Sequence, residues 1–296
     1  MAFRRLRPAT TRKCRPPGRR AKGSLVVASA IGSLLLVGCA PSGAESIQFG
    51  PAAVRQSQDD GLSEAIRRDP VAYLREVLRH TEQIPRYRMT FYRQERTGLS
   101  GSMAPMEKIR VRFRAEPFSV KFEWDDPDAY LYESIYVAGT NDNKLILRER
   151  KGWLLFPPQI RRVDVLDPVR WGQSRRPITD FGITRMMQRT LAAIDHPPGG
   201  GPVEVRYSGR EVLDPLSIEA HHFVILRRAT PAAPHPRQDL WIDARTNLPA
   251  GSRLSLPDGR VDALYLYADI QPDPSISDAD FQVGGPPGTP GKTGKP

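Results

Sequence analysis

The sequence predicts an α+β fold built on an antiparallel sheet. Two stretches, near residues 70–82 and 180–194, repeat apolar residues at the spacing of an amphipathic helix. Three runs between residues 87 and 124 alternate apolar and polar residues, which is typical of strands with one buried and one wet face. Further short apolar runs follow one another without intervening helices, so the pattern favours an antiparallel sheet over βαβ units.

Both predicted helices have recognisable starts. Asp69 suits an N-cap and Pro70 suits the first helical position, where the missing proline N–H breaks no helical hydrogen bond. Apolar residues then recur on one face over residues 71–81. The second helix is expected to begin at a cap on Thr179 or Asp180 and to run to about residue 194.

The three alternating runs define an apolar face that is rich in aromatic residues. Its members are Met89, Phe91, Ile109, Val111, Phe113, Val120, Phe122 and Trp124. Lys and Arg residues alternate with them on the other face, between residues 108 and 121. We interpret this basic row as a solvated sheet surface, with an anion-binding stripe as the alternative.

Later strands are expected from short apolar runs bounded by Pro, Gly, Asn and Asp. They cover residues 134–138, 144–150, 152–156, 203–207, 218–227, 238–243, 251–256 and 261–270. The order of elements is therefore a helix, several strands, a helix and several more strands.

The N-terminal region predicts export and lipid attachment. A basic leader at residues 1–23 precedes an apolar run at residues 24–38, too short for a spanning helix, and the run ends in Leu-Val-Gly-Cys at residues 36–39. This ending resembles the bacterial lipobox, so residues 1–38 are expected to be a lipoprotein signal peptide and Cys39 the lipidated residue. An ordinary secretory signal or an N-terminal membrane anchor is the alternative.

The remaining chain divides by composition. Residues 39–61 are expected to form a flexible tether, residues 62–283 the folded domain, and residues 284–296 a disordered Gly/Pro tail. The protein is expected to face the periplasm from a lipid anchor in the cell envelope, with the choice of membrane and the oligomeric state left open.

Charge and cysteine content exclude several functions. The net charge of +11 includes nine Lys and Arg in residues 1–38, and without them 35 basic residues face 33 acidic ones. The resulting +2 argues against a nucleic-acid partner. With Cys14 in the leader and Cys39 lipidated, no disulfide or thiolate metal site is expected.

Five stretches carry a resemblance to a known family. They are Phe-Tyr-Arg-Gln-Glu at residues 91–95, the run at 116–124, Leu-Trp-Ile-Asp-Ala-Arg-Thr-Asn-Leu-Pro at 240–249, and the closing runs at 265–270 and 276–281. In this order they resemble the bacterial periplasmic lipoprotein-carrier superfamily of the LolA/LolB type, in an uncharacterised branch. The resemblance implies an unclosed, strongly curved antiparallel half-barrel whose concave apolar face is covered by helices.

The resemblance also implies a function. Members bind acyl chains of lipoproteins or sense envelope components in the hydrophobic cavity. Glu116 stands where the soluble carriers have an arginine that helps to hold the helical lid, so the lipid-anchored acceptor of that pathway is the better comparison.

The first functional hypothesis is a non-enzymatic, lipid-anchored protein that binds an acyl chain, lipid or lipoprotein without a cofactor. The eight apolar-face residues would line the cavity, extended by Leu240 and Ile242. The same residues could instead fill a packed core, because small barrels are usually filled by their own side chains. A second hypothesis is a sensor or scaffold that binds another envelope protein and no lipid.

A metal-dependent hydrolase is the third hypothesis. Glu219 and His221 would share one face of a strand, and His235 or an Asp could add a ligand. A polar strand edge explains the same residues, and we prefer it. The sequence has no Gly-x-Ser-x-Gly or His-Glu-x-x-His motif, so no catalytic residue is assigned.

Overall fold

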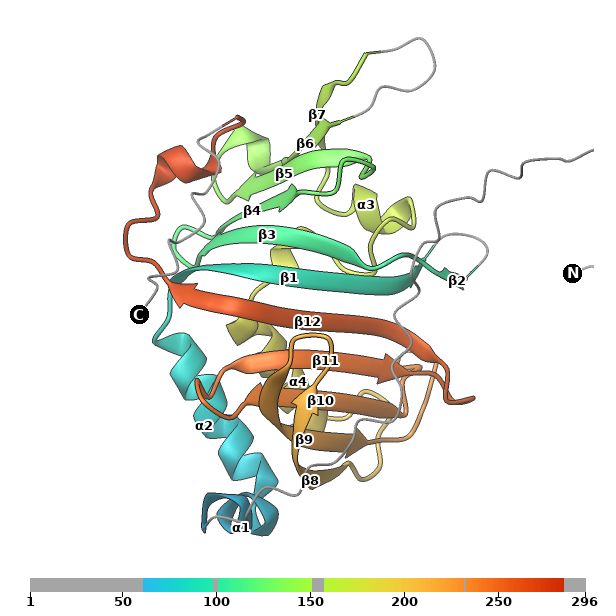
Figure 1. Cartoon of the computed structure of the whole chain (residues 1–296). Helices are drawn as coiled ribbons and strands as arrows, with labels where there is room; N and C mark the ends of the chain where they lie inside the picture. Colours follow the sequence, from blue (N-terminus) through green and yellow to red (C-terminus); the bar gives the residue numbers. More distant parts are fainter. Residues whose placement is uncertain (1–60, 98–100, 151–156, 232, 285–296) are drawn as a thin grey trace, which may run out of the picture. The chain divides into compact units, whose positions relative to one another are not determined.

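The computed structural model describes residues 61–97, 101–150, 157–231 and 233–284. These residues form one antiparallel sheet of twelve strands, in the order β7-β6-β5-β4-β3-β1-β12-β11-β10-β9-β8, with β2 paired to β1 (Figure 1). Within the described ranges, the edge strands β7 and β8 do not pair with each other, so the sheet stays open. The predicted α+β class with an unclosed half-barrel is confirmed.

The strands are β1 Arg86–Thr97, β2 Ser102–Met103, β3 Glu107–Arg114, β4 Ser119–Trp124, β5 Leu131–Val137, β6 Leu145–Glu149, β7 Ile160–Val163, β8 Glu204–Leu213, β9 Ile218–Leu226, β10 Arg237–Asp243, β11 Pro249–Ser255 and β12 Val261–Pro272. The helices are α1 Gly61–Arg68, α2 Pro70–Glu82, α3 Asp167–Arg170 and α4 Ile183–Asp195, with 3₁₀ turns η1 Asn141–Asn143, η2 Ile178–Asp180 and η3 Asp278–Phe281. The predicted strand at residues 152–156 lies outside the described residues.

The register of β1, β3 and β4 produces the predicted apolar face. Met89 pairs with Val111 and Val111 with Phe122, while Phe91 pairs with Ile109. Directly opposed residues point to the same side of a sheet, so the apolar sets of the three strands form one surface. Each of the eight predicted apolar-face residues is buried.

Helix α2 begins as the sequence predicts. The Asp69 carboxylate accepts a hydrogen bond from the backbone N–H of Ala72 at 2.9 Å, and Pro70 is the first helical residue. Leu74 and Val77 are fully buried on the inner face. The preceding helix α1, which buries Ile66, was not predicted because its eight residues carry too short an apolar pattern.

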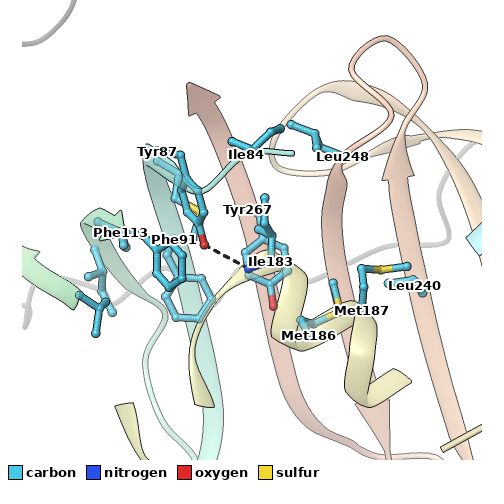
Figure 2. Packing of buried hydrophobic residues seen from close by; sticks show 14 of the residues in the cluster. Ile84, Tyr87, Phe91, Phe113, Ile183, Met186, Met187, Leu240, Leu248 and Tyr267 are labelled. Atoms are coloured by element: carbon cyan, nitrogen blue, oxygen red, sulfur yellow. Dashed lines mark hydrogen bonds between the residues drawn. The ribbon is translucent and has the colours of Figure 1, made fainter. Parts of the chain in front are cut away.

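Helix α4 starts later than predicted. Gly182, with φ of +127°, precedes its first residue, and Thr179 lies in a separate 3₁₀ turn, so the predicted cap at Thr179 or Asp180 is wrong. A Cβ at Gly182 would come within 3.1 Å of the Phe113 ring. The N–H of Ile183 instead donates to the Tyr87 hydroxyl at 3.1 Å, as Figure 2 shows, so a β1 side chain supports the helix start.

The basic row on the outer face is not the solvated surface that the sequence predicts. Arg112, Arg114 and Lys121 are buried, although Lys108 is exposed. The chain after β12 returns to the outer face of β4 and β5, where η3 contacts both strands. We call residues 273–284 the C-terminal segment. Because its contacts span more than a hundred residues, strand alternation could not reveal this cover.

Ion pairs satisfy the buried cations. The Lys121 ammonium lies 2.8 Å from Glu133 Oε2 and donates to the carbonyl of Gln282 at 3.1 Å. The Arg114 guanidinium lies 2.8 Å from Asp278. The C-terminal segment therefore contributes both polar partners and apolar cover.

Among the described residues, no helix combines the length and the apolar character that crossing a bilayer requires.

Candidate functional site

A cavity of about 630 Å³ lies between the sheet and residues 173–198, which include α4. Strands β1, β4, β5 and β6 contribute to one end, and β10, β11 and β12 contribute to the other. The cavity therefore crosses the middle of the sheet, where β1 pairs with β12.

The end formed by β4, β5 and β6 is apolar. Phe122, Leu131 and Leu147 contribute to its wall. The Phe181 ring meets the ring of Phe122 edge-on at a centroid distance of 4.8 Å and that of Phe91 at 5.2 Å. Such aromatic pairs fix the shape of a wall while leaving its surface without hydrogen-bonding groups.

The ten predicted cavity residues separate into two groups. Phe91, Phe122 and Trp124 line the cavity. The other seven residues do not line the cavity and belong to a buried apolar cluster, part of which is drawn in Figure 2. They are Met89, Ile109, Val111, Phe113, Val120, Leu240 and Ile242. The sequence left open whether these residues line a cavity or fill a packed core. In the structure, one part of the apolar face lines a cavity and the other part is packed. A lipid-binding role for these residues stays a prediction.

The packed part is filled from α4. Met187 of α4 is fully buried in the same cluster as Leu240, and Figure 2 draws both residues, whereas Met186 and Tyr267 of that cluster also line the cavity. An unbranched, polarizable methionine side chain fills irregular gaps between helix and sheet.

Cationic side chains also line this cavity, from β1, from residues 175–176, from α4 and from the end of β9. Five arginines line the cavity as a whole, against two carboxylates, those of Glu95 and Asp180. Arg93 forms an ion pair with Glu107 at 2.6 Å, and Arg175 forms one with Asp262 at 2.6 Å. Two cations of the wall are therefore held in place by acidic partners.

A buried carboxylate and a partly buried phenol lie in the same wall. The Tyr265 hydroxyl donates to Glu95 Oε1 at 2.5 Å, and the backbone N–H of Arg175 donates to Glu95 Oε2 at 3.2 Å. Burial, followed by the charge of Glu95, raises the pKa of Tyr265 well above its ordinary value. The phenol thus remains protonated and acts as a fixed donor.

The residues considered for a metal site are not brought together. His221 is fully buried, with Nδ1 2.8 Å from the Tyr207 hydroxyl, whereas Glu219 is exposed. His235 lies instead at the cavity, with Nε2 2.6 Å from Asp262. Over the described ranges, no three His, Cys, Asp or Glu side chains are grouped so that they could hold a metal ion.

Arg114 and Glu116 occupy the stretch in which the lipoprotein carriers have their lid arginine. Arg114 turns to the outer face, where it pairs with Asp278 and lies 5.0 Å from the centroid of the Phe281 ring. It therefore holds the C-terminal segment and does not reach the cavity wall.

A family model described as "Protein of unknown function (DUF1571)" matches residues 84–287. This range includes all twelve strands of the described sheet and the whole cavity wall. The chain belongs to this family. A comparison with curated proteins gave no match.

Similar solved structures include representatives of the lipoprotein-carrier superfamily that the sequence resembles. One is a domain from Vibrio parahaemolyticus assigned to outer membrane lipoprotein sorting, at 9% identity and TM-score 0.32, covering 71% of this chain and 95% of that one. LprF from Mycobacterium bovis has 9% identity and TM-score 0.41, covering 71% and 96%. The Pseudomonas aeruginosa MucA/MucB complex has 14% identity and TM-score 0.36, covering 73% and 61%.

Sequence reasoning did not identify the arginines of the cavity wall. The sequence contains one sign that Arg189 faces the interior. It lies three residues after Met186 and four before Ala193, on the helix face that the apolar residues share. A cation inside an apolar stripe marks a polar contact within the fold. The sequence contains no such sign for Arg227, because this residue follows the last residue of β9 and has no place in a periodic pattern.

Proposed function

We propose that this protein is a non-enzymatic binding protein of the bacterial cell envelope that takes up an acyl chain, as a free lipid or as part of a lipoprotein, in the cavity under α4. The observation that carries the proposal is the hollow, aromatic-walled end of the half-barrel. The whole cavity has a volume of about 630 Å³, which falls in the range of about 300–1,000 Å³ that is usual for small-molecule sites. Each methylene removed from water contributes roughly 0.8 kcal/mol to binding.

The N-terminal region supports the location. Residues 1–38 as a signal peptide, a lipid on Cys39 and a tether to residue 61 would place the cavity near the surface of a bilayer. Cys39, the leader, the tether and the tail after residue 284 all lie outside the described residues, so the domain boundaries stay part of the proposal.

Cavity filling tests the proposal. Ala193 lines the cavity from α4, whereas Gln188 is exposed on the same helix and does not line it. In native mass spectrometry of the full-length protein, we expect a bound mass in the lipid range that Ala193→Trp removes and Gln188→Trp retains. An added fluorescent fatty acid should follow the same pattern.

Two outcomes would contradict acyl-chain binding. One is a protein free of bound lipid that takes up no added fatty acid. The other is equal retention of lipid by Ala193→Trp and Gln188→Trp in variants whose circular dichroism spectra match the wild type.

A second candidate function is the binding of another envelope protein. Large apolar side chains are exposed near β7 and α3, with Ile160 59%, Leu166 42% and Trp171 44% exposed. Exposed apolar residues that lie near one another can mark a partner surface. Crosslinking of a partner that is lost in Ile160→Ser and Leu166→Ser, together with the absence of lipid, would favour this candidate.

A further inference from the structure

Two arginines of the cavity wall lack an acidic partner. Arg189 in α4 donates from Nη1 to the backbone carbonyl of Asp180 at 2.6 Å. Arg227, next to the end of β9, donates to the side-chain oxygen of Gln238, and its Nε is buried without a hydrogen-bond partner. Among the described residues, no carboxylate lies within ion-pair distance of either guanidinium.

The other three arginines of the same wall show the contrast. Arg93 is paired with Glu107, Arg175 with Asp262, and Arg176 with Asp180 at 3.6 Å. A cation withdrawn from water without a counter-charge is unfavourable, and a bound anion removes that penalty. Arg189 and Arg227 thus differ from their neighbours in having donors and charge left for a ligand.

The electrostatic surroundings point the same way. Burial, followed by the positive charge of Arg176, lowers the pKa of Arg189, and burial alone lowers the pKa of Arg227. The guanidinium groups remain protonated at neutral pH, because a guanidinium group keeps its proton throughout the physiological pH range. An anion in the cavity would therefore meet fixed positive charge on side chains that are partly withdrawn from water.

Neutral donors lie next to these cations. The Gln238 amide that accepts from Arg227 donates in turn to the hydroxyls of Thr190 and Ser252, at 3.1 and 3.2 Å. These bonds tie β10 and β11 to α4, so the polar wall is held in place before any ligand arrives.

The positions of the apolar and cationic parts of the cavity along the sheet indicate the chemical class of the ligand. The apolar residues come from β4, β5 and β6, whereas Arg227, Gln238 and Ser252 come from the β9–β11 side, across β1 and β12. One cavity thus has an apolar end and a cationic end, which matches a molecule with an apolar chain and an anionic head.

We propose that Arg189 and Arg227 bind the anionic head group of an amphiphile whose chain occupies the end lined by Phe122 and Leu147. This inference rests on the proposed function, since it names the class of lipid that the same cavity accepts. Guanidinium groups suit this role because their forked N–H donors match the oxygens of a phosphate or carboxylate.

Calorimetric titration of the full-length protein with three probes tests the inference. Dioctanoyl phosphatidylglycerol carries chain and charge, dioctanoylglycerol carries the chain alone, and inorganic phosphate carries the charge alone. We expect phosphatidylglycerol to bind at least about tenfold more tightly than either of the others, as a charge-assisted hydrogen bond in a buried site would give.

Variants assign the effect to the two arginines. Arg189→Gln and Arg227→Gln should each weaken phosphatidylglycerol binding about tenfold and leave dioctanoylglycerol binding unchanged. Arg260→Gln removes the same charge from an exposed arginine paired with Asp258, and should change neither affinity. Melting curves without ligand establish that each variant is folded.

The outcomes separate the two proposals. Equal affinity for both lipids, or an unchanged preference in both arginine variants, overturns the head-group inference and leaves acyl-chain binding intact. Phosphate binding as tight as phosphatidylglycerol binding also overturns it, because the site would then serve a free anion. Failure of both lipids to bind overturns the proposed function itself.

Discussion

His222 on the outer face of the sheet is a titratable residue whose charge affects stability near neutral pH. Its Nε2 lies 3.0 Å from Asp239 Oδ1, its Nδ1 lies 3.4 Å from Glu211 Oε1, and its ring stacks on Trp241 at 5.0 Å. Burial lowers the pKa of His222, but its hydrogen bonds to the two carboxylates outweigh burial, so the pKa is raised above its usual value.

The raised pKa makes stability depend on pH in a defined direction. Protonated His222 stabilises the fold fully below the unfolded-state pKa of about 6.5, and this contribution is lost as the pH rises through the higher folded-state pKa. The free energy of unfolding should therefore fall more steeply above about pH 6.5 in the wild type than in His222→Gln. Urea unfolding across this range measures the difference.

His80→Gln is the control for this comparison, because it removes a histidine of α2 that is remote from Asp239. Parallel pH profiles for the wild type and His222→Gln would contradict the raised pKa. If the pH dependence of the free energy of unfolding also changes in His80→Gln, the dependence arises from a titratable group other than His222.

At the scale of elements, the C-terminal segment stabilises the outer face of β4 and β5. Ile276 and Phe281 are buried with Ile135 and Ile146 in one apolar cluster. Lys121 is fully buried beneath them, and a paired ammonium in such a site depends on cover that excludes water. The segment thus acts as an outer layer of the domain, opposite the cavity.

Removal of the Phe281 ring tests this role. Phe281→Ala leaves a cavity over Ile135 and removes the ring from the Arg114 guanidinium, so we expect a loss of about 3 kcal/mol in the free energy of unfolding. Hydrogen exchange should become faster in β4 and β5 before it changes in β9 and β10.

Val283→Ala is the matched substitution, because Val283 lies in the same segment and is 36% exposed. A loss of less than about 1 kcal/mol in Phe281→Ala, or equal losses in the two variants, would show that the segment contributes little to stability.

At the scale of the whole molecule, the sequence predicts the parts whose contacts are regular. Alternation from Met89 to Trp124 predicts which residues of β1, β3 and β4 form the apolar face, and Asp69 with Pro70 predicts the start of α2. These signals suffice because each depends on residues that are neighbours in the chain or in a hairpin.

The cavity and the buried basic row depend on contacts between distant residues. Arg112 is buried by a segment that begins 161 positions later at Asp273, and Arg189 meets the cavity only because α4 lies across the sheet. Period and propensity describe one element at a time, so they do not distinguish the part of the concave face that is filled from the part that is hollow.

A ligand that reaches both ends of the cavity should stabilise the domain as a unit. It would contact β4–β6, α4 and β9–β11 together, and the unfolded chain has no such site. At a free concentration of phosphatidylglycerol about 100 times its Kd, we expect a gain of about 2.7 kcal/mol in the free energy of unfolding. For a domain of this size, that gain corresponds to a rise of roughly 5–10 °C in Tm.

Differential scanning calorimetry measures the shift as the lipid concentration is increased, with Ala193→Trp as the variant that should show none. Because the ligand links strands from both sides of β1 and β12, the transition should remain single while it moves to higher temperature. An unchanged Tm would contradict binding to the native state. A transition that splits into a shifted and an unshifted component would instead show that the ligand contacts one side of the sheet alone.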